Sequence, residues 1–195
     1  PAGLAYLIAG WSYIAGESAT SIRLLSAASG LATLGLFYLL CREVIGRRAA
    51  VLGSLLLSLS AWHLVYSRLA MPVVLFLMLE LSALYLLLVA FRERQGHAHR
   101  RRLLVLAGVA FGAAAYLHNA FFVLAVVVLV LWTREFLAGE HPLHVIRQRA
   151  LAFLVPALIL ALPYLAYLAI SPGETGARVR AIALTGTPEF QQTRG

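Results

Sequence analysis

The chain has few charged residues, one cysteine, and no aspartate or lysine at all. Charged residues make up 12% of its 195 residues, whereas 62% are hydrophobic. A soluble domain of this size cannot bury so much apolar surface in one core, so the composition excludes an ordinary soluble protein. It is typical of an integral membrane protein with several hydrophobic helices.

Cysteine and metal ligands are equally scarce. Cys41 stands alone, which excludes an internal disulfide, and no metal-ligand spacing surrounds it. His97 and His99 lie in a cationic loop, which is a poor place for a divalent cation. Gly-rich phosphate loops, Ser/His/Asp sets and zinc motifs are also missing, so soluble nucleotide chemistry has no support. Whether the protein needs a divalent metal stays undecided, since the chain carries no motif for one.

The distribution of the basic residues indicates the kind of protein. All sixteen are arginine, and the formal net charge is +8. They form short clusters between hydrophobic runs rather than one stripe, so we expect no nucleic-acid partner. The pattern predicts an all-α, polytopic transmembrane helical bundle of about six spans, after an N-terminal interfacial helix. The helix covers residues 1–16, and the spans cover 19–41, 49–67, 72–91, two short stretches of 103–133, and 150–170.

The apolar run at 103–133 is too long for one crossing. As a straight helix it would reach about 46 Å, against a hydrocarbon core of roughly 30 Å. Both flanking loops are rich in arginine and belong on the same side of the membrane, so the run is predicted to fold back near His118-Asn119. Gly108 and Gly112, like the small residues around Gly30, are predicted to let another helix approach closely.

The distribution of arginine predicts the orientation. Eleven arginines fall in three loops, which the positive-inside rule places in the cytoplasm: Arg42, Arg47, Arg48, Arg92, Arg94, Arg100, Arg101, Arg102, Arg134, Arg147 and Arg149. Five are predicted to lie outside: Arg23, Arg68, Arg178, Arg180 and Arg194. Residues 1–170 are therefore predicted to form the transmembrane domain, and 171–195 an extracytoplasmic loop or tail.

Polar, aromatic and cationic side chains gather at residues 59–72, between two hydrophobic runs. One interpretation is an interfacial anchor, with Trp62 and Tyr66 at headgroup depth and Arg68 reaching for lipid phosphate. The other is a ligand site in a wet cavity, because a guanidinium at the end of a span is costly in lipid. The residues alone favour the anchor.

Glu80 lies in the middle of the predicted span 72–91. A carboxylate there costs roughly 2.5 to 3.5 kcal/mol on insertion scales, so we expect it to face the interior of the bundle. A neutral, hydrogen-bonded structural glutamate is favoured over a proton relay or a sugar contact, because no basic partner is evident at its depth.

Several short motifs resemble one family of enzymes. Trp62-His63 followed by Ser67-Arg68 resembles the Trp-His-x-x-x-Ser-Arg segment of bacterial membrane glycosyltransferases related to protein O-mannosyltransferases and the aminoarabinose transferase (glycosyltransferase family 39, GT-C superfamily). The similarity covers about residues 1–180. Its other motifs are Pro1 with Tyr6, Gly16 with Arg23 and Ser26, Val44 to Arg48, and Gly108, Gly112, Tyr116 and His118.

The resemblance implies a GT-C-like fold and a sugar transfer. The donor would be a polyprenyl-phosphate-linked sugar, and the acceptor a lipid, glycan or protein on the outer face of the bacterial inner membrane. It implies that Arg68 and Arg23 contact the phosphate or the carrier. His63, Tyr66 and His118 would be contacts on the sugar side. For His118, at the predicted turn, a cap of the helix hairpin is an equally favoured interpretation. Arg178 matches an outer-loop segment of some relatives, although a solvated charge is the favoured interpretation there.

The chain also departs from the family pattern. Met71-Pro72 replace an acidic residue of many relatives, and the family's catalytic carboxylate, a general base, is expected upstream of Pro1. No catalytic residue is therefore assigned, and we expect the chain to be an internal part of a longer enzyme and inactive alone. The alternative is a transporter, flippase or non-catalytic membrane subunit that handles lipid-linked anions, as broken helices and Glu80 would suit.

Overall fold

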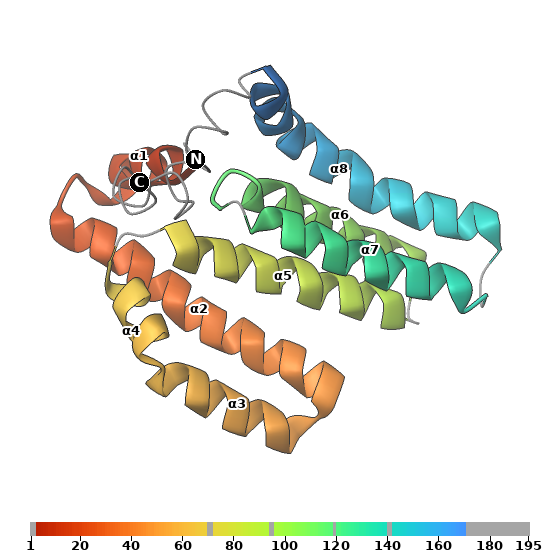
Figure 1. Ribbon diagram of the computed structural model, residues 1–195, viewed down its shortest axis with the longest axis horizontal. Coiled ribbons are helices and arrows are strands. Elements are labelled where there is room, and N and C mark those ends of the chain that lie inside the picture. Colours follow the sequence, from red (N-terminus) through yellow and green to blue (C-terminus); the bar gives the residue numbers. More distant parts are fainter. Residues whose placement is uncertain (1–2, 70–71, 94–95, 119, 140–141, 171–195) are drawn as a thin grey trace, which may run out of the picture.

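The computed structural model describes residues 3–69, 72–93, 96–118, 120–139 and 142–170. Within these ranges the protein has eight helices and no strand, which confirms the predicted all-α class. Figure 1 shows long helices that run back and forth and are joined by short turns. They are α1 (Gly3–Ala15), α2 (Ala19–Ile45), α3 (Arg47–Leu59), α4 (Ala61–Arg68), α5 (Pro72–Arg92), α6 (His97–Ala114), α7 (Phe121–Leu137) and α8 (Leu143–Ile170).

A glycine and a serine separate α1 from α2. Gly16 has a φ of 84°, a left-handed conformation that glycine adopts without a steric penalty. Ser18 then caps α2, because its hydroxyl accepts a hydrogen bond from the backbone N–H of Ser21 at 3.0 Å. The indole of Trp11 donates to the Ser21 hydroxyl at 2.9 Å, so α1 is tied to the start of α2. The N-terminal helix is confirmed, and its place at the membrane interface stays a prediction.

The predicted span 49–67 is interrupted, which corrects the prediction of one continuous helix. α3 and α4 are bent by 61° about Ser60. Ser60 has an extended backbone with a ψ of 124°, and its N–H bonds the carbonyl of Leu57 instead of continuing the α-helical pattern. Serine is a weak helix former, because its hydroxyl can form hydrogen bonds with nearby backbone groups in non-helical conformations. The break allows α4 to leave the direction of α3.

The second half of the chain packs as a bundle of α5, α6, α7 and α8 (Figure 1). Its most buried large side chains come from all four helices and the turn before α7: Leu87, Leu104, Leu117, Leu124 and Phe153. The ring of Phe111 lies 4.8 Å from that of Phe121 and 5.5 Å from that of Phe153, measured between centroids. These contacts join α6 to both α7 and α8, and the predicted hairpin with its turn near His118 is confirmed.

Gly108 and Gly112 form the predicted close-packing face, and the structure shows that α8 is its partner. A Cβ on Gly112 would lie 2.6 Å from the carbonyl oxygen of Ala157. A Cβ on Gly108 would overlap the carbonyl of Phe153 in the same way. Small residues at this spacing allow two helix backbones to approach closely in a membrane, where dispersion contacts rather than water exclusion stabilise the pair.

The count of six spans is not confirmed. Among the described residues, α2, α5 and α8 are long and apolar enough to cross a membrane, and the bent pair α3–α4 raises the count to four. α7 has 17 residues, and α6 begins with three arginines within its first six residues. Apolar side chains such as Leu56, Leu129 and Ile159 are exposed, as expected for surfaces that face lipid. The protein is therefore multi-pass, with the hairpin α6–α7 packed among the longer helices.

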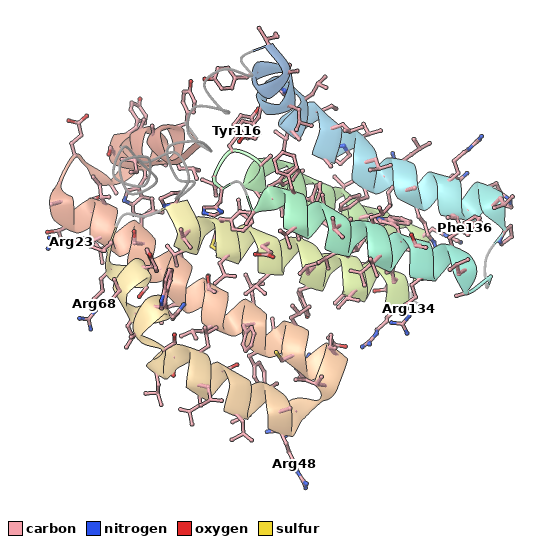
Figure 2. All side chains as sticks on the ribbon, in the orientation of Figure 1. Arg23, Arg48, Arg68, Tyr116, Arg134 and Phe136 are labelled. Carbon is pink, nitrogen blue, oxygen red and sulfur yellow. The ribbon has the colours of Figure 1, made fainter. Side chains whose placement is uncertain are left out.

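The ends of the helix bundle differ in charge. Figure 2 places Arg48 and Arg134 at one end of the molecule and Arg23 and Arg68 at the other. At the first end, Arg92 Nη1 lies 3.0 Å from Glu43 Oε2 and so joins the end of α5 to the end of α2. The three basic loops are thus gathered at one end of the bundle, as the charge pattern predicts. Which side of the membrane this end faces stays a prediction.

Candidate functional site

The short helix α4 lies directly against α2 because residue 30 has no side chain. A Cβ on Gly30 would lie 2.6 Å from the Cβ of Ser67, closer than two such atoms can approach. One turn further along α2, the hydroxyl of Thr33 donates a hydrogen bond to the backbone carbonyl of Ser29 at 2.8 Å. The side chain therefore stays close to its own helix. The contact brings the C-terminal end of α4, with Arg68, onto the N-terminal half of α2, which carries Arg23.

α2 and the end of α4 together line a groove of about 460 Å³. Its lining residues are Thr20, Arg23, Leu24, Ala27, Ser67, Arg68 and Leu69. Figure 2 shows Arg23 and Arg68 at the same end of the molecule, on neighbouring helices. The two arginines that the sequence singled out as phosphate contacts are therefore brought together, although they are 45 positions apart in the chain (68 − 23).

Neither of these guanidinium groups is neutralised within the part of the chain that the structure describes. Arg23 and Arg68 are both exposed, and no described carboxylate forms an ion pair with either of them. Two like charges beside the apolar walls of Leu24 and Ala27 favour an anionic ligand that also has an apolar part. A guanidinium suits a phosphate because its planar fork donates two parallel hydrogen bonds and stays charged.

A comparison with protein families decides the class of this protein. Residues 1–167 match the model of the family described as dolichyl-phosphate-mannose-protein mannosyltransferase. The chain belongs to this family. It is therefore a membrane glycosyltransferase of the GT-C type, as the short motifs suggested. No curated protein and no solved structure gives a significant match to the chain.

Two further predicted contacts of the glycosyltransferase, His63 and Tyr66, lie on α4 but outside the lining of the groove. His63 is buried, one turn before Ser67 and hence on the helix face that meets α2. Tyr66 packs against Trp62 with 4.7 Å between ring centroids. Trp62 is 69% exposed, so this aromatic pair also fits the anchor that the sequence offered as its other interpretation.

His118 lies in the turn between α6 and α7, and its side chain accepts a hydrogen bond within this turn. The backbone N–H of Ala120 donates to His118 Nδ1 at 3.1 Å. With Nδ1 accepting, the neutral ring carries its proton on Nε2 and has one donor left. The ring also packs against Phe76 near the start of α5, with 5.5 Å between centroids. A structural role in the hairpin turn is thus shown, and a sugar contact through Nε2 stays a prediction.

The remaining residues that the sequence singled out do not line the groove. Glu80 is half-buried on α5, and no described residue forms an ion pair with it. Among the described residues, no group of three His, Cys, Asp or Glu side chains is placed to hold a metal ion. His99 Nε2 lies 3.3 Å from Oε2 of Glu93. Arg178, Asn119, Pro1 and the segment 171–195 lie outside the described residues.

The apolar part of the groove was not predicted. Thr20, Leu24 and Ala27 lie at positions −3, +1 and +4 relative to Arg23, which is the spacing of one helix face. A helical projection centred on Arg23 would have found them. The approach of Ser67 to Gly30 has no comparable signal, because it depends on the bend at Ser60.

Proposed function

We propose that the groove between α2 and α4 binds the phosphate of a polyprenyl-phosphate-linked sugar donor. The protein would transfer the sugar to a lipid, glycan or protein acceptor on the extracytoplasmic face of the bacterial inner membrane. One observation carries the proposal: two exposed guanidinium groups, Arg23 and Arg68, share a groove with apolar walls and have no carboxylate partner among the described residues.

The proposed chemistry is a displacement at the anomeric carbon. The bond from this carbon to the donor phosphate oxygen breaks, a bond to the acceptor oxygen forms, and the acceptor proton passes to a general base. Negative charge grows on the departing lipid phosphate, and Arg23 and Arg68 stabilise it through charge-assisted hydrogen bonds. Leu24, Ala27 and Leu69 offer the isoprenoid chain an apolar wall. The base is not assigned within this chain.

The sugar would lie towards the turn that carries His118. The end of α4, the start of α5 and the turn between α6 and α7 all lie at the same end of the bundle in Figure 1. We propose His63, Tyr66 and His118 as contacts on the sugar side, with the free Nε2–H of His118 donating to a hydroxyl. Tyr66 offers a phenol and an aromatic face from the same short helix as Arg68.

A second candidate function has one observation in its favour. The bend of 61° between α3 and α4 is a broken span, and broken spans often surround the substrate sites of transporters. A flippase or a non-catalytic subunit would bind the same lipid-linked anion and leave it unchanged. Formation of a glycosylated product by the purified protein separates the two functions.

The test uses the full-length gene product in membranes and compares it with three variants in which one arginine is substituted. Arg68→Ala removes a contact that strengthens as the phosphate departs, so single-turnover transfer should fall about thirty-fold to a thousand-fold, or roughly 2 to 4 kcal/mol. Arg68→Lys should recover only part of this loss, because a point charge replaces a fork. Arg48→Ala removes an exposed arginine at the opposite end of the molecule and should leave transfer within about two-fold.

The levels of all three variants in the membrane are matched before the rates are compared. If Arg68→Ala transferred sugar as fast as Arg48→Ala, Arg68 would be an interfacial anchor and the proposal would be wrong. An anchor also predicts that Lys substitutes fully for Arg68, because both side chains reach the lipid headgroups equally well.

A further inference from the structure

A second cluster of arginines lies between α6 and α8, in the region of the basic loops. It surrounds a cavity of about 140 Å³. The polar residues that line it are His97, Arg100, Arg101, Gln148 and Arg149. No carboxylate is among the described residues that line this cavity, so its walls carry three guanidinium groups and an amide.

Two of these guanidinium groups keep donors without an acceptor. The Arg149 side chain is only 6% exposed, and its Nη1 lies 2.8 Å from Glu135 Oε1. Arg100 donates from Nη2 to the backbone carbonyl of Glu93. The Nε atoms of both Arg100 and Arg149 are buried and have no hydrogen-bond partner among the described residues. Buried donors of this kind are rare and costly, so an acceptor that fills the cavity would stabilise both.

The start of α6 adds further donors to the same place. α6 begins after Gly96, and no side chain caps its first turn. The first backbone N–H groups of a helix have no partner within the helix, and they carry the positive end of its dipole. His97, in this first turn, lines the cavity. The uncapped helix start and the arginines therefore favour the same ligand, an anion with several oxygens.

The cavity opens into an apolar groove along α8. This groove has a volume of about 540 Å³ and shares Arg101, Gln148 and Ala152 with the cavity. It continues to Val155 and Pro156, about 12 Å from Gln148 along the helix axis. α8 is long and apolar enough to cross a membrane, and Leu151 and Val155 in the groove wall are exposed. We therefore expect this groove to face the hydrocarbon of the bilayer. A ligand that fills both spaces has an anionic head and an apolar tail.

We propose that the cleft between α6 and α8 binds one anionic phospholipid. Its phosphate lies in the cavity among the guanidinium groups, and one acyl chain follows the apolar groove along α8. Basic pockets between transmembrane helices on the cytoplasmic side are suited to anionic headgroups. A free phosphate ion would satisfy the donors of Arg100 and Arg149, but it would leave the groove at Val155 without an occupant. This site is separate from the groove at Arg68 and does not rest on the proposed function.

Native mass spectrometry of the full-length protein in detergent tests this site with phosphatidylglycerol and phosphatidylcholine as the added lipids. The wild-type protein should retain phosphatidylglycerol in preference to phosphatidylcholine. Arg100→Gln/Arg101→Gln should weaken phosphatidylglycerol retention about tenfold or more, since each arginine near the membrane surface contributes about 1 kcal/mol. Arg47→Gln/Arg48→Gln removes two adjacent arginines at the start of α3 and should change it less than two-fold.

Equal weakening by both double variants would show only a general attraction of basic loops for anionic lipid and would overturn the proposal. Val155→Trp supplies an independent test, because it fills the apolar groove without changing any charge. It should reduce phosphatidylglycerol retention several-fold, and it decides the matter if the double variant fails to fold. Full retention in Val155→Trp would show that no acyl chain occupies the groove. Displacement of the lipid by millimolar inorganic phosphate alone would identify free phosphate as the ligand. Either result would contradict the proposal.

Discussion

Arg23 and Arg68 differ in their surroundings from two arginines at the other end of the molecule. Arg42 and Arg92 share one carboxylate partner, Glu43, at 3.3 Å and 3.0 Å. Such pairs hold helix ends together and leave little charge for a ligand. Arg23 and Arg68 have no such partner among the described residues, and exposed charges at the end of a span attract an anion. Arg48 also has no carboxylate partner among the described residues, so it is the shared groove with its apolar walls that locates the candidate site.

His118 supports a prediction that separates its two roles. In His118→Asn, the amide oxygen takes the place of Nδ1 and accepts the N–H of Ala120, so the turn hydrogen bond is kept. His118→Leu loses this bond, and its stability should fall by roughly 0.5 to 1.5 kcal/mol. Both variants lose the Nε2–H, so both should transfer sugar more slowly, by about tenfold. Thermal unfolding in detergent measures the turn hydrogen bond, and single-turnover transfer measures the sugar contact.

The Asn variant decides between these roles. Wild-type transfer by His118→Asn, together with reduced stability of His118→Leu, would show that His118 only stabilises the turn. Slow transfer by a variant of normal stability cannot come from loss of the turn hydrogen bond, and it would assign the residue to the sugar side.

At the scale of helices, the approach of α4 to α2 makes the groove. Gly30→Ala places a methyl group 2.6 Å from the Ser67 Cβ and should push the two helices apart. We expect a stability loss of about 1 to 3 kcal/mol and at least tenfold slower transfer, because Arg68 moves away from Arg23. Gly35→Ala is the matched control on the same helix, since nothing lies within 4 Å of the position that its methyl group takes.

Gly35→Ala should be neutral or slightly stabilising, because alanine favours the helix by roughly 0.5 to 1 kcal/mol over glycine. The two variants thus shift thermal stability in opposite directions. If Gly30→Ala behaved like Gly35→Ala in both stability and transfer, the close packing of α4 on α2 would not be needed for the groove.

Hydropathy and charge predicted most of the helices because both properties are local in sequence. The apolar runs located α2, α5 and α8, and the arginines on both sides of residues 103–133 required the hairpin. The break at Ser60 was missed, since a serine inside an apolar run is usually tolerated and its backbone geometry depends on packing. The six predicted crossings are not confirmed, because α6 begins with three arginines within its first six residues and α7 has only 17 residues.

The candidate site was predicted in its chemistry and missed in its construction. Arg23 and Arg68 were singled out by short motifs, and the structure places both in one groove. Nothing in the sequence pairs Gly30 with Ser67, because contacts between distant residues leave no periodic trace in one chain. Similarly, the sequence predicted the small-residue face of Gly108 and Gly112, but it did not predict that α8 packs against this face.

At the scale of the whole molecule, the charge asymmetry predicts the orientation. The loops near residues 45, 97 and 140 should be cytoplasmic, and positions near 68, 118 and 178 should be reached from outside. Single cysteines introduced at these positions in a Cys41→Ser background are labelled in intact cells with a membrane-impermeant maleimide. We expect labelling at the second set only. Labelling at residue 97 from outside would reverse the orientation and place the Arg68 groove in the cytoplasm.

The central claim is that Arg23 and Arg68 hold one phosphate together, and a double-mutant cycle tests it most directly. The rates of single-turnover transfer are measured for the wild-type protein, Arg23→Ala, Arg68→Ala and the double variant at matched levels in the membrane. If both groups act on one phosphate, the loss in the double variant is well below the product of the two single losses, with a coupling of roughly 1 kcal/mol or more. Losses that multiply would contradict the account, because they would show two charges acting independently.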